Sequence, residues 1–76
     1  MKFPIKNGTS KRPLIWIEIE AEEYIVPCGS EAVVVLGDDP RSYLEIRDDM
    51  VIVWNNSGQA ATVELDGRPA LPNYEI

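Results

Sequence analysis

A hairpin pattern in residues 42–55 constrains this sequence more than any other feature. Two runs of β-branched, aromatic and aliphatic residues lie on either side of Asp48-Asp49, which is typical of two antiparallel strands joined by a two-residue loop. That loop would place Tyr43 opposite Trp54, with side chains alternating between two faces. The sequence predicts that the aliphatic face of this hairpin lies on the core; its residues are Leu44, Ile46, Val51 and Val53.

Residues 14–20 form the clearest single strand pattern. Three isoleucines, Ile15, Ile17 and Ile19, alternate with Trp16 and two glutamates, so the isoleucine face is expected in the core. Residues 22–26 continue as a second short strand. Because Glu and Ala favour helices, a helical turn over residues 18–24 is the alternative for this region.

Further strands are expected at residues 31–36 and 60–65. The run from Ala32 to Leu36 is apolar throughout, which suits a strand covered on both faces. Asp66-Gly67 is a strong type I′ turn signal, so the chain should fold back over residues 68–70. Pro69 cannot donate a ladder hydrogen bond, which places that last strand at a sheet edge.

These patterns predict an all-β fold, a small antiparallel β-sandwich or partly open barrel of six to seven short strands. Residues 14–76 are expected to form a single β domain. Residues 1–13 contain Pro4, Gly8 and Pro13 among basic side chains, and are expected to form a flexible basic N-terminal arm.

The chain lacks the covalent and metal supports that small domains often use. A protein of 76 residues buries only about 60% of its unfolded surface, so its core is small. Cys28 is the single cysteine and the chain has no histidine, so neither an internal disulfide nor a common transition-metal site is available. Self-association is therefore expected as the stabilising device.

Catalytic chemistry has little support in the sequence. No histidine base is present, Cys28 has no partner for nucleophilic catalysis, and residues 14–76 contain no lysine. The glutamates at 18, 20 and 22 have the spacing of a solvated strand face. We therefore expect a non-enzymatic protein without a cofactor. Calcium is the one metal that the residues allow, at the loops with Asp38-Asp39 and Asp48-Asp49, and the sequence leaves this open.

Charge divides the chain into two parts. Residues 1–13 carry four basic side chains and no acid, whereas residues 14–76 carry three arginines against thirteen acids. An acidic body repels phosphate backbones, so a nucleic acid is not expected as a partner. A membrane is not expected as a partner either, because the apolar runs are too short to span a bilayer. An alternative function is an inhibitor-type protein (an antitoxin, immunity or anti-defence factor) whose acidic surface blocks a basic nucleic-acid-binding protein.

The aromatic residues supply the candidate site. Trp16, Tyr43 and Trp54 fall on strand faces opposite the aliphatic ones, either as a covered second layer or as an exposed patch. Aromatic, Met and Arg side chains are enriched at protein interfaces. The predicted partner-binding residues are Trp16, Tyr43, Arg47, Met50 and Trp54, and the predicted function is a protein-interaction module that self-associates through the Tyr43/Trp54 strand face.

A cytoplasmic location is expected. The single cysteine fits a reducing compartment, the first residues lack the apolar segment of a signal peptide, and the apolar runs are too short to cross a bilayer. Asn7-Gly8-Thr9 and Asn55-Asn56-Ser57 match the glycosylation pattern, but nothing else in the sequence indicates secretion.

Overall fold

The computed structural model describes residues 1–11 and 14–72, which form strands, turns and loops without a helix. The strands are β1 (Lys2–Lys6), β2 (Leu14–Glu18), β3 (Glu22–Ile25), β4 (Glu31–Val35), β5 (Tyr43–Ile46), β6 (Met50–Trp54), β7 (Thr62–Leu65) and β8 (Arg68–Pro69). Their β-branched and aromatic content favours extended backbone. The all-β prediction is confirmed, and the helical alternative for residues 18–24 is wrong because this segment is a turn followed by β3.

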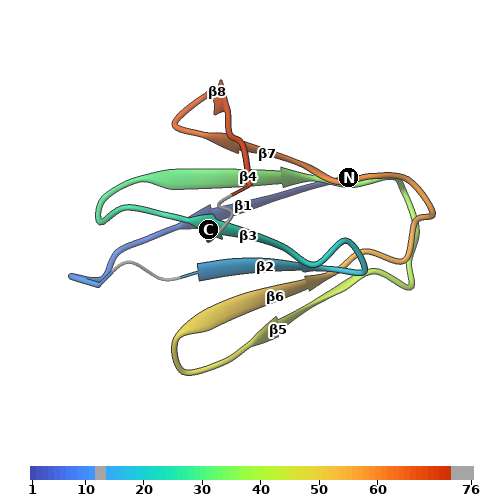
Figure 1. Ribbon diagram of the computed structural model, residues 1–76, viewed down its shortest axis with the longest axis horizontal. Helices are drawn as coiled ribbons and strands as arrows, with labels where there is room; N and C mark the ends of the chain where they lie inside the picture. Colours follow the sequence, from blue (N-terminus) through green and yellow to red (C-terminus); the bar gives the residue numbers. More distant parts are fainter. Residues whose placement is uncertain (12–13, 73–76) are drawn as a thin grey trace.

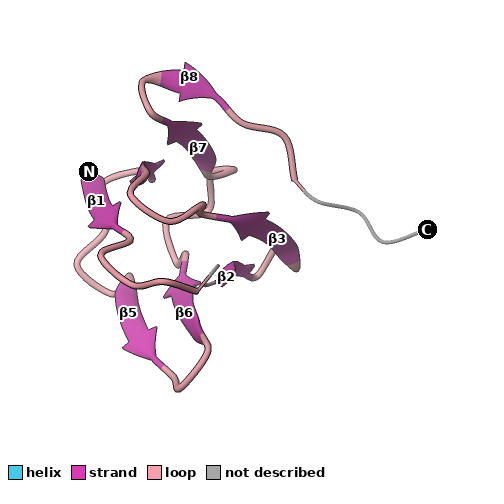
Figure 2. Cartoon of the chain, turned by 90° about the vertical axis from the view of Figure 1, so that its left-hand side faces the viewer, coloured by secondary structure: helices cyan, strands magenta, loops and turns pink. Residues whose placement is uncertain are grey.

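The strands form two four-stranded sheets that face each other (Figures 1 and 2). Sheet A has the order β1-β4-β7-β8, and sheet B has the order β3-β2-β6-β5. Neighbouring strands run antiparallel except β2 and β6, which run parallel with Trp16 beside Ile52. The sequence did not predict this parallel pair, because an alternating strand can pair in either direction.

The core lies between the sheets and comes from the inner faces of β2, β4, β6 and β7 and from residues in and next to β3 and β4. Its buried residues are Ile15, Ile17, Tyr24, Val26, Ala32, Val34, Leu36, Val53, Ala61 and Val63. Ile19, predicted to join them, is 71% exposed because β2 ends at Glu18 and the chain turns over residues 19–21.

The hairpin β5–β6 has the predicted register. Tyr43 pairs with Trp54, and the backbone N–H of Arg47 donates to the carbonyl of Met50 across the two-residue loop, at 2.8 Å. The second predicted turn is also present, since Asp66 and Gly67 both have positive φ (49° and 81°), as a type I′ turn requires.

The aliphatic face of the hairpin is only partly in the core. Its exposure rises from 0% at Val53 to 39% at Leu44 and 82% at Ile46. The prediction that Leu44 and Ile46 lie on the core is therefore wrong. β5 is the last strand of sheet B, and the described residues leave its inner face uncovered toward the hairpin tip (Figure 2).

The structure also corrects the prediction of a flexible arm over residues 1–13. Lys2–Lys6 form β1 and pair antiparallel with β4, with Phe3 and Ile5 packed against the core. Pro4, which lacks an N–H, is tolerated because β1 is an edge strand. Residues 12 and 13 of the predicted arm lie outside the described residues.

Two loops of the same design carry the chain between the sheets, residues 7–11 from β1 to β2 and residues 55–59 from β6 to β7. Each starts with a buried asparagine, Asn7 or Asn55, whose Oδ1 accepts from the backbone N–H and the hydroxyl of Thr9 or Ser57. Both amide nitrogens donate within the fold, that of Asn7 to two carbonyls. The two glycosylation-like patterns are thus loop-forming elements with engaged asparagines.

Candidate interaction surface

The side of sheet B that faces away from sheet A carries all five residues that the sequence singles out. We call it the outer face of sheet B. Trp16 lies between two buried isoleucines of β2 and so points outward, as do the residues of β6 and β5 that share its ladder rows. The predicted residues on this face are Trp16, Tyr43, Arg47, Met50 and Trp54.

An aromatic pair lies at the β5 side of this face. The rings of Tyr43 and Trp54 stack with centroids 5.9 Å apart and an interplanar angle of 19°. Tyr43 is 53% exposed, whereas Trp54 and Trp16 are half-buried. The face therefore has features of both arrangements that the sequence leaves open, an exposed tyrosine and two half-buried tryptophans.

Carboxylates on the same face hold both indole rings. The Trp54 Nε1–H donates to Glu45 Oε1 at 3.0 Å, and the Trp16 Nε1–H donates to a carboxylate oxygen of Glu18. Each indole N–H is thus satisfied within the protein, and the Trp54 ring also stacks on Tyr43. Rings fixed in this way lose little conformational entropy when a partner covers them.

Glu45 joins the aromatic pair to the hairpin loop. Its Oε2 accepts from Arg47 Nε at 2.8 Å while its other oxygen accepts from Trp54. The hydrogen bond from Arg47, and then that from Trp54, lower the pKa of Glu45 below its ordinary value. The carboxylate therefore stays ionised and the charge of Arg47 is paired.

The exposure of the hairpin side chains differs in two places from what the alternation predicts. Ile52 lies in the middle of the outer face beside Trp16, yet its neighbours reduce its exposure to 9%. Leu44 and Ile46 are exposed on the opposite side of the same hairpin. No alternation pattern distinguishes an exposed aliphatic face from a buried one, so the sequence carries no signal for this.

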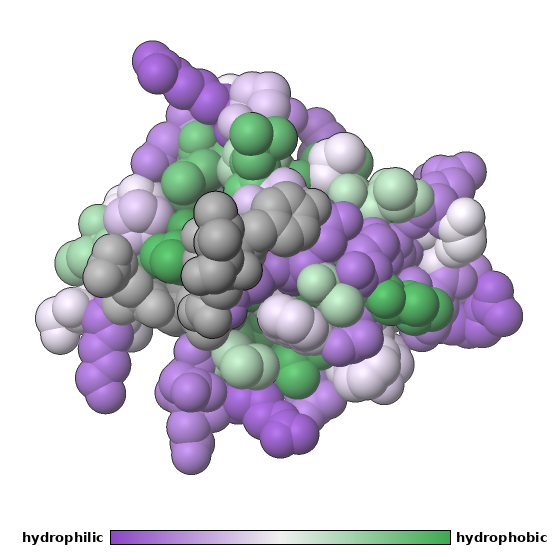
Figure 3. Space-filling view, in the orientation of Figure 1, coloured by the Kyte–Doolittle hydropathy of each residue, from purple (hydrophilic) through white to green (hydrophobic). Residues whose placement is uncertain are grey.

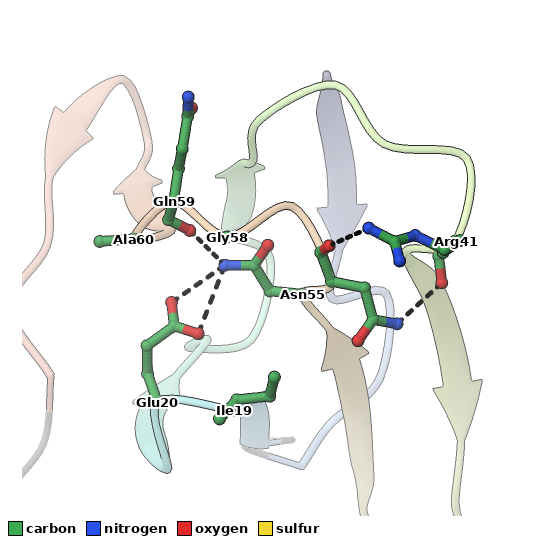
Figure 4. A pocket seen from close by; sticks show the side chains of 8 residues that line it. Ile19, Glu20, Arg41, Asn55, Gly58, Gln59 and Ala60 are labelled. Carbon is green, nitrogen blue, oxygen red and sulfur yellow. Dashed lines mark hydrogen bonds between the residues drawn. The ribbon is translucent and has the colours of Figure 1, made fainter.

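A hollow of about 710 Å³ lies at one end of the sandwich, where the turn after β2 meets two loops (Figure 4). Its polar groups bond to one another: the Glu20 carboxylate accepts from Asn55 Nδ2 and from the backbone N–H of Ala61, and Arg41 pairs with Asp39. Polar groups already paired in this way give no strong reason to place a ligand here.

In the loop after β4, both aspartates bond to positively charged groups of the protein itself. Asp38 accepts from the N-terminal ammonium at 2.6 Å, and Asp39 pairs with Arg41 at 2.7 Å. The hydrogen bonds from Arg41 lower the pKa of Asp39 to about 2. Over residues 1–11 and 14–72, no group of three or more acidic, Cys or His side chains is placed to hold a metal ion.

The comparisons with known proteins give no relative. No protein-family model, curated protein or solved structure matches this chain. In the part of the chain that the structure describes, no helix is long and apolar enough to span a membrane.

Proposed function

We propose that this protein is a non-enzymatic protein-interaction module that self-associates through its β5–β6 hairpin, with the Tyr43/Trp54 pair as part of the contact. The observation that carries the proposal is the exposure of this hairpin. Among the described residues, five large hydrophobic side chains are exposed, and Tyr43, Leu44 and Ile46 of β5 are three of them. Exposed apolar side chains concentrated on one short element are typical of an interface.

The composition of the chain supports a second copy as the partner. A small core without a disulfide gains stability when a second chain covers its exposed apolar surface. On the side seen in Figure 3, hydrophobic residues occur in small groups divided by hydrophilic ones.

Light scattering on a sizing column, over a range of concentrations, tests this proposal. We expect twice the mass of one chain at high concentration and dissociation on dilution. Tyr43→Ser should weaken the association while leaving the fold intact, and Ile19→Ser, which removes an exposed side chain elsewhere, should leave the association unchanged. A mass of one chain at every concentration would overturn the proposal.

A second candidate function rests on the acidic border of the same face. Asp48 and Asp49 are exposed at the hairpin tip, and Glu18 and Glu45 flank the tryptophans. An inhibitor that covers a basic surface would use such a border. Binding to a basic target that weakens steeply with added salt would favour this candidate, whereas self-association through apolar contacts changes little with salt.

A further inference from the structure

Three of the four sheet edges in the described structure carry features that prevent another strand from pairing there. β1 has Pro4 at its centre and a lysine at each end, β8 is two residues long and contains Pro69, and β3 begins with Glu22 and Glu23. Proline, charge and short length are the usual means by which proteins protect exposed edges.

The fourth edge, β5, contains no proline and fewer charged residues than β3. Tyr43 is exposed on one face, and Leu44 and Ile46 are exposed on the other. Its one charged residue, Glu45, is paired with Arg47. An edge without proline and with apolar side chains on both faces is suited to receiving another strand.

The ladder with β6 shows which backbone groups of β5 are free to pair. Arg47 donates to Met50, so positions 43, 45 and 47 direct their N–H and C=O groups toward β6. In an antiparallel strand these groups alternate in direction. Those of Leu44 and Ile46 therefore point to the open edge.

We propose that β5 pairs antiparallel with β5 of a second copy of this chain across a two-fold axis, so that two B sheets become one. Because the axis is perpendicular to the sheet, two side chains opposite each other across the strand pair lie on the same side of the joined sheet. Three alignments use the free backbone groups of β5, with Leu44, Glu45 or Ile46 on the axis. The structure favours the one with Ile46 opposite Ile46 of the second copy. In this alignment Glu45 of each copy lies opposite Arg47 of the other copy, so the contact contains two pairs of opposite charge.

Neither of the other two alignments places opposite charges next to each other. With Glu45 on the axis, the two Glu45 carboxylates are directly opposed. Like charges directly opposite one another destabilise a strand pair. With Leu44 on the axis, Tyr43 lies opposite Glu45 of the second copy, so no pair of opposite charges forms; Arg41 precedes β5 in a turn and is outside the paired strands.

Pairing through β5 also explains why assembly would stop at two chains. The joined sheet ends in β3 at both sides, where Glu22 and Glu23 protect the edge. A two-fold contact of this kind is closed, so it does not continue into a fibre. The Tyr43/Trp54 pairs of both copies then lie on the same side of one continuous sheet.

This inference rests on the proposed self-association and specifies its geometry. The first test compares Ile46→Lys with Ile19→Lys, both at exposed isoleucines, with the melting temperature of each as a check of folding. We expect Ile46→Lys to raise the dimer Kd by about tenfold or more, because two lysines would meet on the axis. Ile19→Lys should leave the dimer Kd unchanged.

The second test uses charge reversal at the paired positions. Glu45→Arg alone and Arg47→Glu alone should each weaken the dimer, since each places like charges opposite one another in a pair of identical chains. An equimolar mixture of the two variants should form a mixed dimer, because every cross-strand pair is then of opposite charge. Recovery in the mixture also shows that both variants are folded.

The outcomes separate the two proposals. A monomeric wild-type chain overturns the self-association itself. A wild-type dimer that withstands Ile46→Lys and both charge reversals overturns the β5 pairing and leaves self-association through another contact. A dimer lost in the single variants and restored in the mixture supports the edge-to-edge geometry.

Discussion

Single residues of similar chemistry have very different roles in this protein according to how far the two sheets overlap. Val53 and Ile46 belong to the same predicted face of one hairpin, yet their exposures are 0% and 82%. Val53→Ala should lower the free energy of unfolding by about 2 kcal/mol, because it leaves a cavity in the core. Ile46→Ala should change it by less than about 0.5 kcal/mol.

Urea unfolding at a concentration where the chain is monomeric measures both values. A similar loss in the two variants would contradict the exposed position of Ile46. The dilute condition matters because the proposed dimer would add its own stability to Ile46.

Protonation of Glu45 provides a second test at the scale of the residue. Because its folded-state pKa is lowered, chiefly by Arg47, this carboxylate stabilises the fold above its ordinary pKa of 4.5. That stabilisation is lost as the pH falls through the folded-state pKa. Arg47→Met should raise the pKa of Glu45 toward its ordinary value, as followed by NMR of the side-chain carboxyl and of the Trp54 Nε1–H.

Arg41→Met is the matched control, since Arg41 pairs with Asp39 rather than Glu45 and lowers the pKa of Asp39. It should raise the pKa of Asp39 from about 2 and leave that of Glu45 unchanged. A Glu45 titration that is the same in wild type and Arg47→Met would contradict the pairing on the outer face.

At the scale of the element, the turn between β7 and β8 requires a positive φ, and the Asp66-Gly67 sequence predicts it. Gly67 has φ of 81° in the turn between β7 and β8, and no atom would contact a Cβ added there within 4 Å. Gly67→Ala should therefore destabilise the protein by about 1 kcal/mol through backbone strain alone.

Gly8→Ala is the control for this turn. A Cβ at Gly8 also meets nothing within 4 Å, and its φ lies outside the left-handed region. We expect a change of less than about 0.5 kcal/mol in urea unfolding. Equal losses at Gly8 and Gly67 would show that the cost at Gly67 does not come from its positive φ.

The two loops that connect the sheets, residues 7–11 and 55–59, are the element-scale feature that the sequence did not predict. Asn7 and Asn55 stand in turn-like, polar segments, where solvent exposure would be the ordinary expectation. The structure buries both, and each amide bonds to its own loop and to a group outside it, Val26 or Glu20. Because Val26 and Glu20 are remote in sequence from the asparagines they bond to, no local sequence pattern predicts these contacts.

At the scale of the molecule, the arrangement of edges carries the functional argument. A two-sheet sandwich has four open edges, and in the described residues three are protected by proline, charge or short length. The association prediction belongs to this scale, because no single residue distinguishes β5 from β3. The comparison of all four edges does.

The sequence by itself determined the features that depend on neighbours along the chain: the strand alternation, the register of the β5–β6 hairpin, the Asp66-Gly67 turn and the shared face of the hairpin residues Tyr43, Arg47, Met50 and Trp54. Each follows from a two-residue period or from a turn conformation. The tertiary structure alone decided the parallel pairing of β2 with β6, the strand formed by Lys2–Lys6, and the exposure of Ile19, Leu44 and Ile46. The physical reason is that alternation separates two faces of a strand without specifying whether another layer extends far enough to cover either one.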